Sequence, residues 1–153
     1  MRQVAFKTVL PLYYEKSLEE LLFFHPNQHY YARAIEYNLL HYGEIKLVHK
    51  NENLIISLSK VKARSLFILD SPSDHATLLG SAIYFLDKES VVVVHISVLS
   101  ECGEKSLFQM ELITYRMLEK LRSIYSQNRY KDLLLPYYGK RLSINNRITT
   151  VVD

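Results

Sequence analysis

The residues able to do chemistry gather in one strand-like segment and the short polar loop that follows it. Residues 91–99 alternate as a β-strand does and carry His95 among aliphatic residues. The loop brings Glu101, and Lys105 lies where a long amphipathic helix is expected to begin. Histidine exchanges protons near neutral pH, and the free N–H groups at a helix N-terminus bind anions, above all phosphates. The pattern predicts a proton-transfer group beside an anion site.

The environment of His95 decides whether it is catalytic. Strict alternation puts His95 on one strand face with Val91 and Val93, and puts Val92 and Val94 on the other face. In that position His95 either takes a proton from a reacting group or is a core histidine hydrogen-bonded by its neighbours. Both interpretations stay open at this point.

Two further patterns carry less chemistry. Cys102 lies just before the expected helix, but no histidine is adjacent to it in sequence, so we expect an inert thiol. His25 and His29 are four residues apart, but Pro26 interrupts the helix that would bring them together. We therefore expect neither a nucleophilic cysteine nor a metal site.

Composition indicates a globular protein with a substantial core. The chain has 153 residues, 48% of them hydrophobic and 23% charged, with a net charge of +3. These values predict a single domain over residues 1–153, and the mildly basic charge favours acidic ligands. The single cysteine fits a reducing compartment, and no apolar run has the length of a signal peptide or a membrane span. A cytoplasmic protein without a membrane partner is the expectation.

Hydrophobic periodicity predicts an α+β fold with a mostly antiparallel central sheet, two N-terminal helices and one long central helix. The first helix is expected to start at a capping box over residues 17–20 and to stop at Pro26, and the second to run from Asn27 to a C-terminal Gly43. The central helix is expected at residues 105–127. The expected strands cover residues 3–10, 44–49, 54–61, 64–70, 79–86, 91–99, 132–135 and 144–152.

This order of elements resembles that of the GCN5-related N-acetyltransferase (GNAT) superfamily. The family fold runs strand, two helices, antiparallel meander, central helix and a further strand, and the hairpin at residues 44–61 would be an addition. Residues 79–84 (LGSAIY) resemble the family's third strand, and residues 98–101 resemble the end of its fourth. Residues 102–108 then fall on the loop that holds the pyrophosphate of acetyl-CoA in the family.

The resemblance implies an acyltransferase that moves an acyl group from acetyl-CoA, or another acyl-CoA, to an amine. It implies His95 or Glu101 as the base and Tyr138 as the acid that protonates the departing thiolate. The cofactor-binding residues that it implies are Val98, Leu99, Gly103, Glu104, Lys105 and Ser106.

The loop departs from the family pattern. Gly103 stands where the family has arginine or glutamine, Glu104 stands at its first glycine, and Ser106 and Phe108 stand at the later glycines. Glycines there let the backbone approach the phosphates closely, and a glutamate would repel them. The alternative is therefore a GNAT-shaped domain without catalysis that acts as a binding or interaction module.

The expected partner is a small-molecule or peptide amine acceptor. Five basic residues lie among tyrosines between residues 129 and 147, a composition that can hold a nucleic-acid backbone but is more often a solvated edge. Nucleic acid is therefore not the expected partner, and a homodimer stays open.

Overall fold

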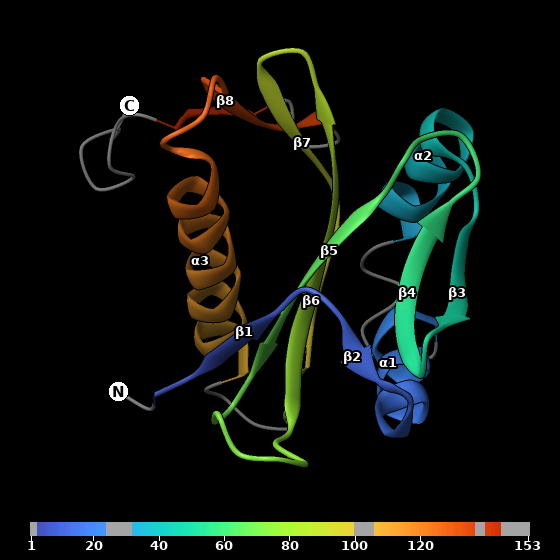
Figure 1. Cartoon of the computed structure of the whole chain (residues 1–153). Coiled ribbons are helices and arrows are strands. Elements are labelled where there is room, and N and C mark those ends of the chain that lie inside the picture. Colours follow the sequence, from blue (N-terminus) through green and yellow to red (C-terminus); the bar gives the residue numbers. More distant parts are fainter. Residues whose placement is uncertain (1–2, 24–31, 100–105, 137–139, 145–153) are drawn as a thin grey trace.

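The computed structural model shows an α+β protein and describes residues 3–23, 32–99, 106–136 and 140–144 (Figure 1). Its helices are the 3₁₀ helix η1 (Leu12–Tyr14), α1 (Glu15–Phe23), α2 (Ala32–Tyr42) and α3 (Ser106–Tyr125). Its strands are β1 (Ala5–Lys7), β2 (Leu10–Pro11), β3 (Ile45–Lys50), β4 (Asn53–Leu58), β5 (Arg64–Leu69), β6 (Leu78–Asp87), β7 (Ser90–Val98), β8 (Asp132–Leu135) and β9 (Lys140–Ser143).

The strands form two sheets. The larger sheet has six strands in the order β1-β5-β6-β7-β8-β9, and the smaller has three in the order β2-β4-β3. Neighbouring strands of the larger sheet are antiparallel except β7 and β8, which are parallel. A parallel pair needs a long crossover, and α3 provides it. The sheet is therefore mixed, with the antiparallel meander β5-β6-β7 at its centre.

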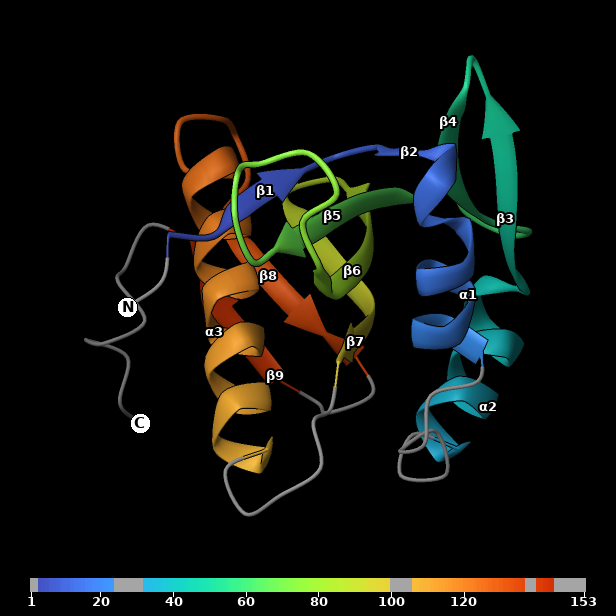
Figure 2. The same ribbon diagram turned by 90° about the horizontal axis from the view of Figure 1, so that it is seen from below.

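Helices cover both faces of the larger sheet. Helix α3 packs on one face, and α1 and α2 lie on the other face together with the small sheet (Figures 1 and 2). The α3 face is an apolar core in which Met117 and Leu121 are fully buried, and a pocket of about 430 Å³ opens at its β1 edge beside Lys120 and Ile124 of α3. On the α1/α2 face, Leu18 of α1 and Phe67 of β5 are fully buried.

The N-terminal segment differs from its prediction in two respects. The single strand expected at residues 3–10 is two strands, because β1 pairs with β5 in the larger sheet and β2 pairs with β4 in the smaller. Helix α1 begins at Glu15, directly after η1, so Ser17 lies inside the helix and is not its N-cap. The chain turns through Pro11 and η1 and already has helical backbone at Glu15.

The C-terminal edge also differs. Strand β9 occupies residues 140–143, where no strand was expected, and it pairs antiparallel with β8. The edge strand predicted over residues 144–152 lies outside the described residues except for Ile144, whose N–H donates to the carbonyl of Lys131 at 2.8 Å.

The link from α2 to β3 is as predicted. Gly43 ends the helix with a φ of +95°, and its N–H donates to the carbonyl of Leu39 at 3.2 Å. A Cβ at this position would overlap Ser59 Oγ. Glycine is therefore required here both for its backbone conformation and for space, and the site described below depends on this turn.

Candidate functional site

A β-bulge in β7 decides which way His95 points. His95 pairs with Ile83 of β6, whereas the next β6 residue, Tyr84, pairs with Val93, so Val94 is an extra residue. Beyond the bulge the alternation is reversed. Val93 packs into the α3 core, whereas Val94 and His95 both lie on the α1/α2 face. The prediction that His95 shares a face with Val91 and Val93 is wrong, because it assumed an unbroken alternation.

Helix α2 supplies the polar group that the bulge requires. The side chain of Asn38 is 3% exposed, and its Nδ2 donates to the carbonyl of Val94 at 2.7 Å. A bulge disrupts the strand ladder locally, and a buried carbonyl without a donor is costly. Asn38 therefore holds α2 against β7 at the residue before His95.

His95 is a buried, neutral imidazole. Its side chain is 7% exposed, and its Nε2 lies 2.8 Å from Ser97 Oγ. Burial lowers the pKa of His95 from 6.5 to about 4, because the charged form would lose its hydration. At neutral pH the ring therefore has one nitrogen that accepts and one N–H that donates a hydrogen bond.

A row of buried hydroxyl groups continues from this pair across the sheet. Ser97 pairs with Ser81 of β6, and the alternation of β6 puts Ser81 on the same face as Ile83. Ser81 is fully buried. Its Oγ has no hydrogen-bond partner among the described residues, which is also true of Ser65 Oγ on β5. Buried hydroxyls are normally paired, so this face has polar capacity that its own side chains do not use.

A pocket of about 260 Å³ opens beside His95 on the α1/α2 face. Its apolar walls are Leu22 and Phe23 at the end of α1, Leu39 on α2 and Ile45 on β3. Its polar lining consists of Asn38, Glu44 and His95. Gly43, between α2 and β3, also lines it. The pocket is therefore mainly apolar, with few polar groups, which is typical of small-molecule sites.

Glu44 is the one charged residue among these lining residues, because His95 is neutral. Its position is fixed by the turn after α2, where its backbone N–H donates to Ser59 Oγ at 3.0 Å. Within the described ranges no cationic side chain forms an ion pair with Glu44. Among the described residues, the pocket lining therefore carries one exposed carboxylate without an ion-pair partner.

Strand β8 accompanies β7 for only part of its length. The parallel pairing joins Ser90, Val91 and Val92 to Asp132, Leu133 and Leu134. The bulge and His95 come after the last of these pairs. The half of β7 that carries His95 therefore extends past its pairing with β8, toward the start of α3.

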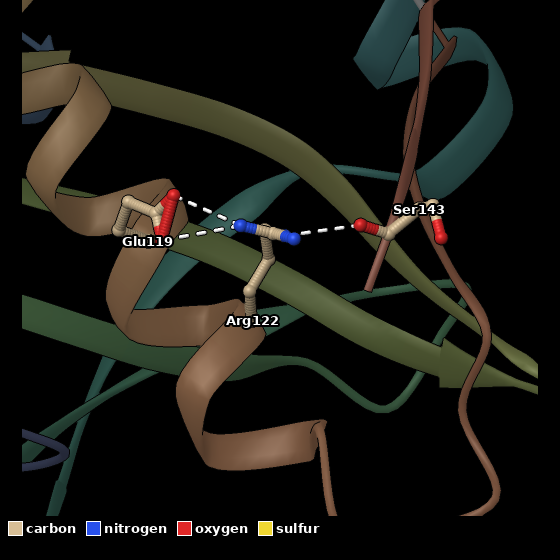
Figure 3. A network of polar contacts seen from close by, with 3 residues as sticks. All are labelled: Glu119, Arg122 and Ser143. Atoms are coloured by element: carbon tan, nitrogen blue, oxygen red, sulfur yellow. Dashed lines mark hydrogen bonds and ion pairs between the residues drawn. The ribbon is translucent and has the colours of Figure 1, made fainter. Parts of the chain in front are cut away.

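The polar groups of the α3 face, by contrast, are paired with one another. Arg122 is almost fully buried, donates from Nε to the carbonyl of Ser143 at 3.0 Å and from Nη1 to Glu119 Oε1 at 2.9 Å (Figure 3). The hydroxyls of Tyr84 and Tyr125 lie 2.9 Å apart. These contacts fasten β9 and β6 to the helix and open no pocket at that point.

The sequence-predicted site residues are only partly within the described structure. His95 lines the pocket, whereas Val98 packs into the α3 core and Leu99 donates its N–H to the carbonyl of Leu79 at 2.7 Å. Ser106 is the first residue of α3. The other predicted residues, Glu101, Gly103, Glu104, Lys105 and Tyr138, lie outside the described residues, as do Cys102, His25 and His29.

Sequence reasoning missed the residues that surround His95. Asn38 had a signal, because it falls four residues before Tyr42 and four after Ala34 on the apolar stripe expected for α2. A polar residue in an apolar stripe commonly has a buried partner. Glu44 had no such signal, because a glutamate after a helix-ending glycine is ordinary surface composition.

The basic C-terminal segment is partly neutralised. Lys131 Nζ lies 3.6 Å from Glu89 Oε1, and Arg141 Nη1 lies 3.6 Å from Asp132 Oδ2. Both are surface ion pairs, and they reduce the positive charge available to a nucleic acid at this edge.

The described residues contain neither a cluster of metal ligands nor a membrane-spanning helix. Within the described residues, no three histidine, cysteine, aspartate or glutamate side chains come together as a metal would require. In the same part of the chain, none of the helices has the length and apolar character needed to cross a bilayer.

In comparisons with known proteins, no family model, no curated protein and no solved structure matches this chain.

Proposed function

We propose that this protein transfers an acyl group from an acyl-CoA thioester to an amine, as its resemblance to the GNAT superfamily suggests. One observation carries the proposal: the part of β7 that extends past β8 bears a buried, neutral histidine that lines an apolar pocket. This arrangement offers an extended backbone for one substrate and a pocket with a proton acceptor for the other. The order of helices and strands around β7 supports the same proposal.

The described residues fit the cofactor in one respect. An acyl-CoA supplies an activated acyl group at the end of an arm that contains amides. Extended backbone of the kind found in β7 after Val92 binds such amides by hydrogen bonds, in the manner of an added strand. Val98 would take part through its backbone, because its side chain packs toward α3. Gly103, Glu104, Lys105 and Ser106 remain the predicted cofactor-binding residues of the loop and the start of α3.

His95 and Ser97 would move the proton that the attacking amine must lose. Ser97 Oγ can give its proton to His95 Nε2, 2.8 Å away, while it accepts the proton of the amine. With a pKa of about 4, the charged imidazole would persist only briefly and would pass its proton on. Glu101 remains the alternative base, and Tyr138 remains the predicted acid for the thiolate.

Thermal stabilisation by acyl-CoA is the direct test. Acetyl-CoA and longer acyl-CoAs at about 100 times their dissociation constant should add about 2.7 kcal/mol to the free energy of unfolding. ATP is the matched control, because a chain with a net charge of +3 can bind any polyanion weakly. A rise in melting temperature with acyl-CoAs but not with ATP is the expected result.

Thioester consumption separates catalysis from binding. An acyltransferase releases free CoA thiol in the presence of an amine, and the release should fall at least about 100-fold in His95→Gln if His95 is the base. No stabilisation with any acyl-CoA would refute the proposal. Stabilisation without thiol release for any amine would leave the alternative, a domain of this shape that binds without catalysis.

A further inference from the structure

The pocket beside His95 has the size and the walls for one small ligand. Its volume of about 260 Å³ exceeds the roughly 150 Å³ of an engineered apolar cavity that holds benzene. The four apolar walls, Leu22, Phe23, Leu39 and Ile45, come from three different elements. A single ring with a short chain, or an alkyl chain of similar volume, would fill this space.

The polar groups of the pocket limit which charge the ligand can carry. Asn38 already donates its amide to the Val94 carbonyl, and His95 is neutral. Glu44 carries the charge, and no cation of the described residues is paired with it. A carboxylate ligand would be repelled by Glu44. A neutral ligand that covered Glu44 would take away part of its hydration without offering a partner.

We propose that this pocket binds a small primary amine with an apolar body, whose ammonium group pairs with Glu44. The apolar body lies against the walls from α1, α2 and β3, and the amino end lies on the side of Glu44 and His95. This inference deepens the proposed function by naming the class of acceptor, and it rests on that function only for the reaction that follows binding. Aryl-alkyl and alkyl monoamines are the class that fits both volume and charge.

A matched series of ligands tests the charge requirement. Phenylethylamine, phenylethanol and phenylpropionate share a ring and a short chain but differ in the charge of the end group. We expect the amine to bind about fivefold more tightly than the alcohol, as a partly exposed ion pair allows, and the carboxylate to bind most weakly. Amide chemical shifts of Asn38 and His95, followed by NMR in the absence of any acyl-CoA, report the binding and its place.

Two variants test whether the preference for the amine over the alcohol arises in this pocket. Glu44→Gln should weaken amine binding about fivefold and leave alcohol binding unchanged, because it removes only the charge. Glu36→Gln is the control, since Glu36 is an exposed carboxylate on α2 that does not line the pocket. Leu39→Ala removes an apolar wall and should weaken the amine and the alcohol alike.

The outcomes also distinguish this inference from the proposed function. Equal binding of amine and alcohol, or a preference that survives in Glu44→Gln, would overturn the inference. Acyl-CoA binding with thiol release toward other amines, but no apolar amine in the pocket, would overturn it while the acyltransferase proposal stood. A fivefold loss of amine binding in Glu44→Gln, with alcohol binding unchanged, would support it even if no acyl-CoA bound.

Discussion

The two faces of the six-stranded sheet treat buried polar groups differently. On the α3 face, Arg122 and the Tyr84–Tyr125 pair use their polar atoms on one another or on the backbone. On the α1/α2 face, His95 is buried at the edge of a pocket, and Ser81 Oγ has no partner among the described residues. The buried polar groups of the α3 face are therefore satisfied within the protein, whereas the α1/α2 face retains a buried hydroxyl that is not.

The bulge in β7 creates this difference. The extra residue, Val94, reverses the alternation and turns His95 and Ser97 away from α3. A bulge re-aims the side chains that follow it, and bulges are over-represented next to active sites. We therefore expect the α3 face to respond to substitution as a structural core and the α1/α2 face to respond as a binding site.

The largest effect is expected from truncation of a buried side chain on the α3 face. Leu121→Ala removes a fully buried side chain from α3 and should lower the free energy of unfolding by about 3–4 kcal/mol. Leu39→Ala, in the pocket wall, removes a side chain that is 54% exposed and should cost less than about 1 kcal/mol. Urea unfolding of both variants measures the contrast, and equal losses would contradict the distinction between the faces.

The second largest effect is a pH dependence of stability that arises from His95 on the α1/α2 face. The pKa of His95 is lowered from 6.5 to about 4, so between these pH values the unfolded chain binds more protons than the folded one. Stability should therefore be unaffected by His95 above pH 6.5 and should fall by about 3 kcal/mol as the pH drops from 6.5 to 4.

His95→Asn should remove this component from the stability profile, and NMR titration of the His95 ring measures the same equilibrium directly. His49→Asn is the control: it removes an exposed histidine of β3 together with its 2.9 Å contact to Glu15 Oε2, and the component that belongs to His95 should remain. A His95 ring that protonates near pH 6.5 would show that it lies in water and would contradict its place at the base of the pocket.

A smaller effect tests whether the polar network of the α3 face is structural. Arg122→Met leaves the carbonyl of Ser143 without its donor and should lower stability by about 2 kcal/mol. Glu119→Gln keeps an acceptor for Arg122 and should cost less than about 1 kcal/mol. Hydrogen exchange should show the loss concentrated in β8 and β9. Reduced amine or acyl-CoA binding by Arg122→Met without a loss of stability would contradict a structural role.

Much of the fold could be predicted because its elements are long and periodic. The pattern of residues 105–127 identified α3, the hairpin turns separated their strands, and Gly43 marked the end of α2. Short elements were missed, because β1 and β2 read as one extended segment without a turn signal between them. The change from one sheet to the other there depends on pairing partners that are distant in sequence.

The site was less predictable than the fold. His95 could be identified as a titratable residue within an apolar strand, but its face could not, because an unbroken run of valines gives no sign of a bulge at Val94. The partnership of Asn38 with that bulge joins residues 56 apart in sequence. Glu44 becomes relevant only when α1, α2 and β3 are brought around one pocket.

The smallest effects should have opposite signs on the two faces. Tyr84→Phe removes a hydroxyl that is paired with Tyr125 and should lower stability by about 1 kcal/mol. Ser81→Ala removes a fully buried hydroxyl without a partner and should raise the stability of the ligand-free protein by about 1 kcal/mol.

The two variants should change stability in opposite directions, because a buried polar group is costly when unpaired and favourable when paired. Thermal unfolding of both in the absence and presence of a saturating ligand completes the test. If Ser81→Ala is more stable than the wild type alone but gains less from the ligand, then the hydroxyl is satisfied only in the complex. Ser81→Ala could instead destabilise the ligand-free protein as much as Tyr84→Phe does. That result would mean that the buried polar groups of the α1/α2 face are paired as fully as those of the α3 face.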